Sequence, residues 1–153
     1  MKTAFAGQAL AAILVAAGAA FAPAVSYAQS AAKPAMQKSE RYKVVLQVSD
    51  SDPAKWNLAL NNARNIQEDL GKANVDIEIV AYGPGLPMLK GDSKVAARLA
   101  QALDDNIGLM ACENTLRNTK VGKDDLYGGI SSVDAGVVHI MKRQREGWAY
   151  VRP

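Results

Sequence analysis

The one cysteine of the chain, Cys112, is the residue best suited to covalent chemistry, and it follows directly on a short apolar run. Residues 107–111 (IGLMA) predict a buried strand, and polar residues that favour a turn or a helix come after the thiol. Open α/β sheets place their sites at the carboxyl ends of strands, so we expect Cys112 at such an edge. Amide N–H groups and the positive end of a helix dipole would there stabilise the thiolate, which is the nucleophilic form.

Charged and polar residues around the thiol predict opposing effects on its pKa. Asn114 and Thr115 can hydrogen-bond a thiolate, and Arg117 can attract its charge. Glu113 and Asp50 would raise the thiol pKa, because nearby negative charge disfavours a further anion.

The chain offers no obvious general base for this thiol. Its one histidine, His139, belongs to the expected last helix, and we expect it at the helix surface, away from Cys112. A Cys-His hydrolase is therefore disfavoured, and one cysteine with one histidine does not form a zinc site. No phosphate-loop, dinucleotide-binding, zinc-protease or nucleophile-elbow motif occurs, so no metal and no cofactor is expected. Two interpretations of the thiol stay open, a group-carrying nucleophile and a small core residue.

The first 28 residues have the order of a secretory signal peptide. Lys2 supplies a positive charge, residues 4–21 are almost wholly apolar, and Ser26-Tyr27-Ala28 has small residues where a cleavage site requires them. We expect cleavage near Ala28 and a periplasmic or secreted protein without membrane contact; retention as an anchor is the alternative. Residues 29–40 are small and polar, and we expect a flexible leader.

The remaining residues, 41–153, predict one domain in which strands and helices alternate. We expect an α/β fold, a three-layer α/β/α sandwich with a mostly parallel sheet of about five strands. The hydrophobic pattern predicts strands over 42–49, 75–81, 107–111, part of 125–130 and 148–151, and helices over 53–70, about 93–105, 113–118 and from a cap at Ser131 to the glycine at 147.

A binding crevice is expected around the thiol. If the first strand is central, with the second and third on either side, the residues after strands one and three meet at one edge. The turn Tyr82-Gly83-Pro84-Gly85 follows the second strand, and its glycines permit positive φ or close approach of a ligand. The expected neighbours of Cys112 are Ser49, Asp50, Tyr82, Gly83 and Asn114, with Arg117 supplying positive charge.

The charge balance gives no reason to expect nucleic acid as a partner. A net charge of +3 over 153 residues is small, and the basic residues are scattered apart from 142–145 (KRQR). We expect that run to be the solvated last turn of a helix, where cations suit the helix dipole.

Four segments together resemble the DsrE/DsrF-like family, in its exported single-domain branch. They are residues 47–57 (QVSDSDPAKWN), 80–86 (VAYGPGL), 111–117 (ACENTLR) and 143–150 (RQREGWAY), and the resemblance runs from about Tyr42 to Pro153. It implies a three-layer α/β/α domain that assembles as homo- or hetero-oligomers. The better understood members are cytoplasmic sulfur-relay subunits whose cysteine after the third strand carries persulfide sulfur, and Cys112 falls at a comparable place.

Three functions stay open on these grounds. The first is an exported sulfur (persulfide) carrier or thiol-handling protein that acts through Cys112, as a homo-oligomer with a thiol or sulfur donor or acceptor as partner. The expected export of this chain differs from the cytoplasmic location of the sulfur-relay subunits. The second is a non-enzymatic oligomeric module that binds a small ligand or a protein, with Cys112 structural. The third is a purely structural oligomer, which an exposed apolar face on the last helix would support.

Overall fold

The computed structural model describes residues 41–153; the expected signal peptide (1–28) and flexible leader (29–40) lie outside these residues. The elements, in chain order, are β1 (Tyr42–Val48), α1 (Pro53–Leu70), the 3-10 helix η1 (Lys72–Asn74), β2 (Val75–Ala81), the 3-10 helix η2 (Gly83–Leu89), α2 (Ala96–Asp104), β3 (Gly108–Cys112), α3 (Glu113–Thr119), the 3-10 helix η3 (Lys123–Asp125), β4 (Ser131–Val133), α4 (Gly136–Arg145) and β5 (Ala149–Val151).

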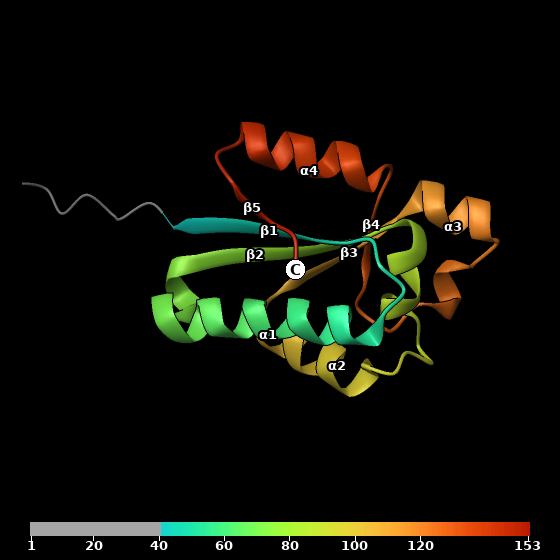
Figure 1. Cartoon of the computed structure of the whole chain (residues 1–153), viewed down its shortest axis with the longest axis horizontal. Helices are drawn as coiled ribbons and strands as arrows, with labels where there is room; N and C mark the ends of the chain where they lie inside the picture. The colour runs from blue at the N-terminus through green and yellow to red at the C-terminus, as the bar shows by residue number, and fades with distance from the viewer. Residues whose placement is uncertain (1–40) are drawn as a thin grey trace, which may run out of the picture. The chain divides into compact units, whose positions relative to one another are not determined.

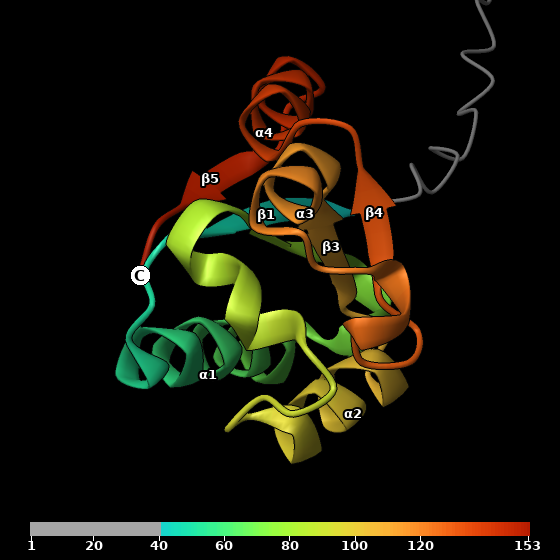
Figure 2. The ribbon, with the colours of Figure 1, turned by 90° about the vertical axis from the view of Figure 1, so that its right-hand side faces the viewer.

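The five strands form one sheet, and every neighbouring pair is parallel. Helices α1 and α2 cover one face and α4 covers the other, which confirms the expected α/β fold (Figure 1). Because all strands run the same way, their carboxyl ends meet at one edge, which faces the viewer in Figure 2 together with α3.

The strand order corrects one expectation. Among the first three strands, β2 and not β1 lies in the middle. The order is β4-β3-β2-β1-β5. The chain adds one strand at a time from β1 to β4 in the same direction, and α4 then returns across the opposite face to place β5 beside β1. The expected crevice between the first and third strands is therefore wrong, because β2 separates them.

The fourth strand and the start of the last helix also differ from the expectation. The strand is Ser131–Val133, after the predicted 125–130, and it pairs with Met110–Cys112 of β3. Gly129 has φ +89 and belongs to the turn before the strand. Ser131 therefore does not cap the last helix, which begins at Gly136 after Ala135.

The predicted boundaries of the first helix are confirmed. Asp52 accepts a hydrogen bond from the Ala54 amide at 2.8 Å, and Pro53 is the first helical residue, where no N–H is needed. Gly71 ends the helix with φ +86. Within residues 41–153, no helix is long and apolar enough to span a membrane.

Alternation along the strands divides the core into two unequal parts. The larger part, under α1 and α2, includes Leu46, Ile77 and Ile79. The smaller part, under α4, consists of Val45, Val80 and Ile140 with partly buried neighbours. Glu78 alternates with Ile77 and Ile79, so its carboxylate lies on the α4 face of the sheet.

Candidate functional site: a buried thiol at the carboxyl edge

Cys112 ends β3 and immediately precedes α3, at the edge predicted for it. The residue is only 5% exposed. Its sulfur accepts a hydrogen bond from the backbone N–H of Gly136, the first residue of α4, with the nitrogen and sulfur 3.2 Å apart. Two helices thus begin beside one sulfur atom.

Thr115 provides a second support for the sulfur. The Thr115 hydroxyl and amide are both hydrogen-bond donors to Cys112. The hydroxyl oxygen in turn accepts a hydrogen bond from the Gly83 amide at 2.9 Å. Because that bond occupies only a lone pair, the hydroxyl proton remains available for donation to the sulfur.

Burial and hydrogen bonding act in opposite directions on the thiol. Burial raises the pKa of Cys112, whereas hydrogen bonds from the Gly136 amide, the Thr115 hydroxyl and the local amides lower it, and together they hold the pKa below its ordinary value. The environment therefore favours the thiolate without a positively charged side chain against the sulfur.

Tyr82 packs closely against Gly136. A Cβ atom at position 136 would lie 3.0 Å from Cδ1 of Tyr82 and 3.2 Å from its Cβ, so a larger residue would require this ring to shift. The ring also packs against the small core under α4. Burial raises the pKa of Tyr82, and its proximity to Cys112 contributes in the same direction.

The structure brings Tyr82, Gly83 and Asn114 close to the sulfur, with roles that differ from the expectation. The Asn114 amide donates mainly to the Asp134 carbonyl, at 3.2 Å, and is the weakest of the hydrogen bonds that affect the thiol. The Asn114 side chain accepts a hydrogen bond from Arg117 rather than contacting the sulfur. Arg117 also lies 3.7 Å from Glu113 and is mostly exposed.

Ser49 and Asp50 lie on the far side of β2 from the thiol. The Ser49 hydroxyl accepts a hydrogen bond from Gln47, and the Asp50 carbonyl accepts one from the Trp56 indole at 2.7 Å. The Asp50 carboxylate lies 3.6 Å from Arg152. Among the described residues, neither of the two contacts Cys112 by any hydrogen bond or ion pair.

A second buried network lies under α4, around Glu78. This carboxylate, 9% exposed, accepts two hydrogen bonds from Arg143, at 2.5 and 2.9 Å, and lies 2.7 Å from Nε2 of His139. Burial raises the pKa of Glu78, but Arg143 and His139 outweigh it and hold the pKa below its ordinary value. Arg143 also stacks over Trp148, 4.7 Å from the ring centroid.

This network corrects two expectations about the last helix. His139 is not a surface residue, because its side chain is 18% exposed and reaches the sheet. Arg143 is not a solvated cation like its neighbours in the basic run, because it binds a buried carboxylate. His139 and Arg143 are separated by one helical turn, next to the buried Ile140. Both side chains therefore lie over β2, where they meet Glu78.

Two residues of these networks, Glu78 and Gly136, were missed in the sequence, whereas Thr115 was expected to hydrogen-bond the thiolate. Glu78 lies between Ile77 and Ile79 in β2, and a charged residue buried at such a place requires a partner. Thr115 follows Cys112 by three residues, the spacing at which a helix cap meets a side chain of the first turn. Gly136 had no such signal, because its role depends on the ring of Tyr82, which lies far away in the chain.

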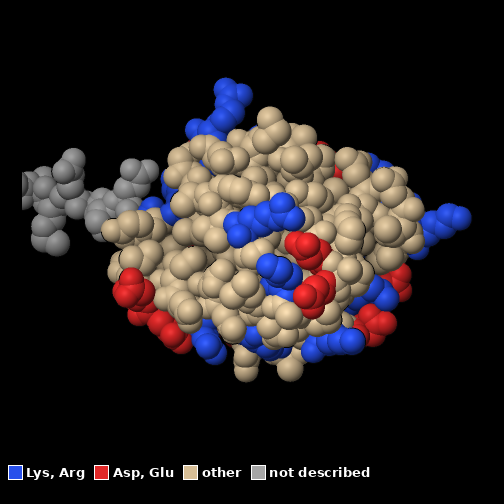
Figure 3. Space-filling view, in the orientation of Figure 1, with Lys and Arg blue, Asp and Glu red and all other residues tan. Residues whose placement is uncertain are grey.

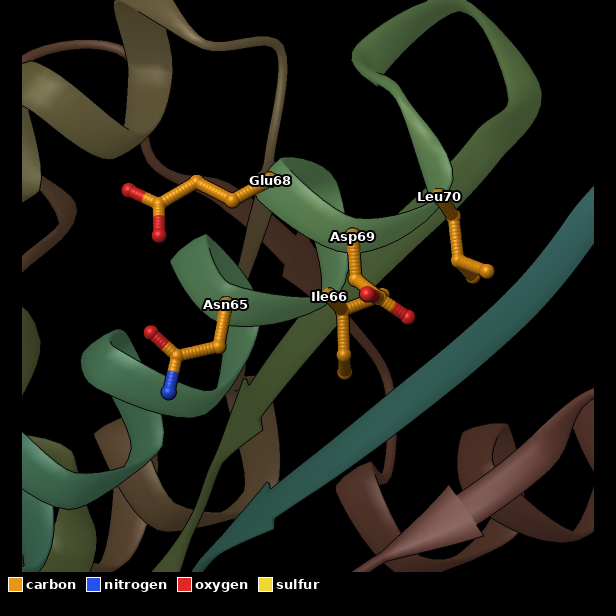
Figure 4. Close-up of a pocket in the computed structure, with 5 residues that line it drawn as sticks. All are labelled: Asn65, Ile66, Glu68, Asp69 and Leu70. Atoms are coloured by element: carbon orange, nitrogen blue, oxygen red, sulfur yellow. The ribbon is translucent and has the colours of Figure 1, made fainter.

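Several hollows along residues 41–153 lie away from the thiol. One of them runs along the end of α1, at the opposite edge of the sheet, and is lined by Asn65, Ile66, Glu68, Asp69 and Leu70 (Figure 4). It contains two carboxylates and no nucleophile. Among residues 41–153, no three His, Cys, Asp or Glu side chains gather as a metal site would require.

Charged side chains of both signs are interspersed on the face shown in Figure 3, and much of that face is uncharged. A continuous basic stripe, which would suit a nucleic-acid backbone, does not occur on that face.

Comparison with solved structures identifies relatives of the fold. MTH1491 from Methanobacterium thermoautotrophicum, a protein of unknown function, is 39% identical, with a TM-score of 0.70 over 73% of this chain and 99% of that chain. BT1422 from Bacteroides thetaiotaomicron, also of unknown function, is 16% identical, with a TM-score of 0.60 over 78% of this chain and 99% of that one. YchN from E. coli is 12% identical, with a TM-score of 0.60 over 74% and 99%.

The latter two similarities concern the fold alone, and YchN has a DsrE-like fold. The chain matches no protein-family model and no functionally curated protein sequence. The similarity to MTH1491 extends from the fold to the sequence, because it combines 39% identity with nearly complete coverage of that protein. The chain therefore belongs to the family of MTH1491, whose architecture fits a DsrE-like family at the level of the fold.

Proposed function

We propose that the protein handles sulfur through Cys112, as a persulfide carrier. The observation that supports this most is the set of neutral donors around the sulfur, led by the Gly136 amide at 3.2 Å. These donors favour the thiolate and leave it without a bound counter-charge, so the anion stays available as a nucleophile. The resemblance to sulfur-relay proteins and the DsrE-like fold agree with this role.

The chemical step requires no base and no cofactor. The Cys112 thiolate attacks the outer sulfur of a neutral donor persulfide, R–S–SH, and a new S–S bond forms on Cys112, which becomes Cys–S–SH. The donor's S–S bond breaks, and the donor leaves as the thiolate R–S⁻. One S–S bond replaces another, so charge is conserved and no external oxidant or reductant is consumed.

Access to the sulfur requires a local movement, because Cys112 is 5% exposed. Tyr82 is the side chain that lies over the Gly136 amide beside the sulfur, and it is itself half-buried. The donor would reach Cys112 after rotation of this ring or a shift of the first turn of α4.

Mass spectrometry tests the carrier role directly. After incubation with glutathione persulfide, the protein should gain about 32 mass units, the mass of one sulfur atom. The Cys112→Ser variant should gain none, and dithiothreitol should remove the added mass from the wild type. Iodoacetamide should alkylate Cys112 in the native protein faster at neutral pH than its burial alone would allow. No adduct on Cys112, together with slow alkylation, would exclude the carrier role.

The exported location belongs to the same proposal. The order of charged, apolar and small residues over 1–28 supports cleavage near Ala28 and release into the periplasm or medium. Determination of the N-terminus of the mature protein tests it, with Gln29 as the expected first residue and Met1 as the contrary result.

The apolar surface of α4 favours a second function, an oligomeric binding module in which Cys112 is structural. Val137, Val138 and Met141 are 54%, 44% and 58% exposed and lie on one side of the helix. Such a surface suits a second copy of the chain. Light scattering should then report an oligomer that Val137→Lys and Met141→Lys dissociate, and a monomeric wild type would oppose it. In this case Cys112→Ser should leave assembly and ligand affinity near normal.

A further inference from the structure

A polar hollow of about 300 Å³ lies between β4 and α4, outside the thiol site. One wall comes from β4 and the turn after it, and the other comes from successive turns of α4. The lining residues are Ser132, Val133, Asp134, Ala135, Val138, His139 and Lys142. A volume of this size is at the lower end of the range for small-molecule sites.

His139 lines this hollow, and its contact with Glu78 determines which ring nitrogen carries the proton. Nε2 of His139 lies 2.7 Å from the Glu78 carboxylate, which can only accept a hydrogen bond because its lowered pKa keeps it ionised. Nε2 therefore carries the proton, and in the neutral ring Nδ1 holds a free lone pair. Among the described residues, nothing hydrogen-bonds Nδ1, and the histidine lines the hollow.

The buried carboxylate holds this histidine as second-layer carboxylates hold functional histidines in other sites. Arg143 binds the same carboxylate twice, so Glu78 cannot turn away from the ring. The position of Nδ1 is thus determined by three side chains from two elements.

Two opposite charges face the same hollow without neutralising each other. Asp134 lies at the turn before α4, and Lys142 lies one turn beyond His139 along the helix. Within residues 41–153, neither side chain takes part in an ion pair, although both line the hollow. The space between them is therefore suited to a ligand with a cationic and an anionic group.

We propose that this hollow binds a small zwitterionic α-amino acid. The ligand carboxylate pairs with Lys142, and its ammonium group donates to the Asp134 carboxylate and to Nδ1 of His139. Val133, Ala135 and Val138 provide an apolar wall for a short aliphatic side chain. The site is independent of sulfur chemistry at Cys112.

Titration of the full mature chain with L-alanine tests this inference, with isothermal calorimetry and amide chemical shifts as readouts. We expect saturable binding with shifts at Asp134, Ala135 and Val138. Acetate and methylamine, which each carry half of the recognised group, should bind at least about tenfold more weakly, because each lacks one charge-assisted hydrogen bond.

Variants distinguish a built site from a surface effect. Lys142→Met and Asp134→Asn should each weaken L-alanine binding about tenfold, and both residues are exposed, so the fold should tolerate these changes. His139→Gln should weaken binding as well. Lys120→Met, an exposed cation outside the hollow, and Cys112→Ser should leave it unchanged. Absence of saturable binding, equal binding of acetate, or insensitivity to Lys142→Met would overturn the inference.

Discussion

Two buried acidic groups, the thiol of Cys112 and the carboxyl of Glu78, lie on the α4 face of one sheet, and the structure favours their anionic forms in different ways. Cys112 receives backbone amides and a hydroxyl, all of them neutral. Glu78 receives the guanidinium of Arg143 and the ring of His139. Both pKa values are lowered, but only the carboxylate carries a bound counter-charge.

The difference indicates which of the two groups can react. A carboxylate held twice by Arg143 is neutralised, and its lone pairs are occupied. A thiolate held by neutral amides keeps its net charge and its nucleophilicity. We therefore assign anchoring of α4 to the Glu78 network and reactivity to the Cys112 network.

Removal of the charge of Glu78 should produce the largest effect on stability. Glu78→Gln removes the buried counter-charge of Arg143, which keeps only its exposed pair with Glu146. The loss of one partner of a buried ion pair costs about 3–5 kcal/mol. Urea unfolding measures this loss. The matched control is Glu68→Gln, which breaks the exposed i,i+4 pair with Arg64 and should cost about 0.5 kcal/mol.

The pH dependence of Glu78 should follow from the same network. Because its pKa is lowered in the folded state, its contribution to stability is complete above the ordinary value of 4.5 and is lost as the pH falls through the folded-state pKa. Glu78→Gln should lose this acid-dependent part. If wild type and variant had parallel stability curves below pH 4.5, the anchoring role would be contradicted.

Insertion of one methyl group at Gly136 should disturb the thiol network. Gly136→Ala places a Cβ 3.0 Å from the Tyr82 ring, and overpacking of this kind costs about 1–3 kcal/mol. The same displacement should weaken the bond from the Gly136 amide, raise the pKa of Cys112 and slow its alkylation at neutral pH.

Two further variants separate overpacking from a general effect of the substitution. Gly128→Ala should be nearly neutral, because no atom lies within 4 Å of the added carbon. In a Tyr82→Ala background, Gly136→Ala should cost much less, because the ring that it contacts is gone. Additive effects of the two substitutions would show that Tyr82 does not position Gly136.

The fold was largely predictable from the sequence, because alternation and caps are local signals. Asp52, Pro53 and Gly71 define the first helix without any knowledge of its neighbours. Strand order was not predictable, because the pattern of each strand records its two faces and not the strand beside it. The placement of Ser49 and Asp50 near the thiol failed for this reason, whereas Tyr82 and Gly83 do lie near it.

Removal of the Thr115 hydroxyl should have a smaller effect, confined to the network around Cys112. Thr115→Val removes a donor to the sulfur and the acceptor of the Gly83 amide, and we expect a loss of about 1–2 kcal/mol. Alkylation of Cys112 at neutral pH should slow about fivefold. Thr115→Ser keeps the hydroxyl and should retain both properties. Equal alkylation rates for the valine and serine variants would exclude the hydroxyl as a donor.

The smallest predicted effect is the dependence of stability on pH that the thiol itself contributes. The folded-state pKa of Cys112 lies below the ordinary value of 9.0, so the unfolded chain binds more protons in the interval between the two. The free energy of unfolding should therefore rise with pH across that interval, by at most about 1.4 kcal/mol per pH unit, and the gain should be complete above pH 9.0. Glu78 is ionised in both states throughout this range, so it contributes no slope there. Unfolding should be measured for wild type and Cys112→Ser between roughly pH 6 and pH 10, a range that brackets a thiol pKa. The free energies of unfolding of the two proteins should diverge as the pH rises. Curves that stay parallel would mean that folding does not stabilise the thiolate, and the contrast between the two networks would then be lost.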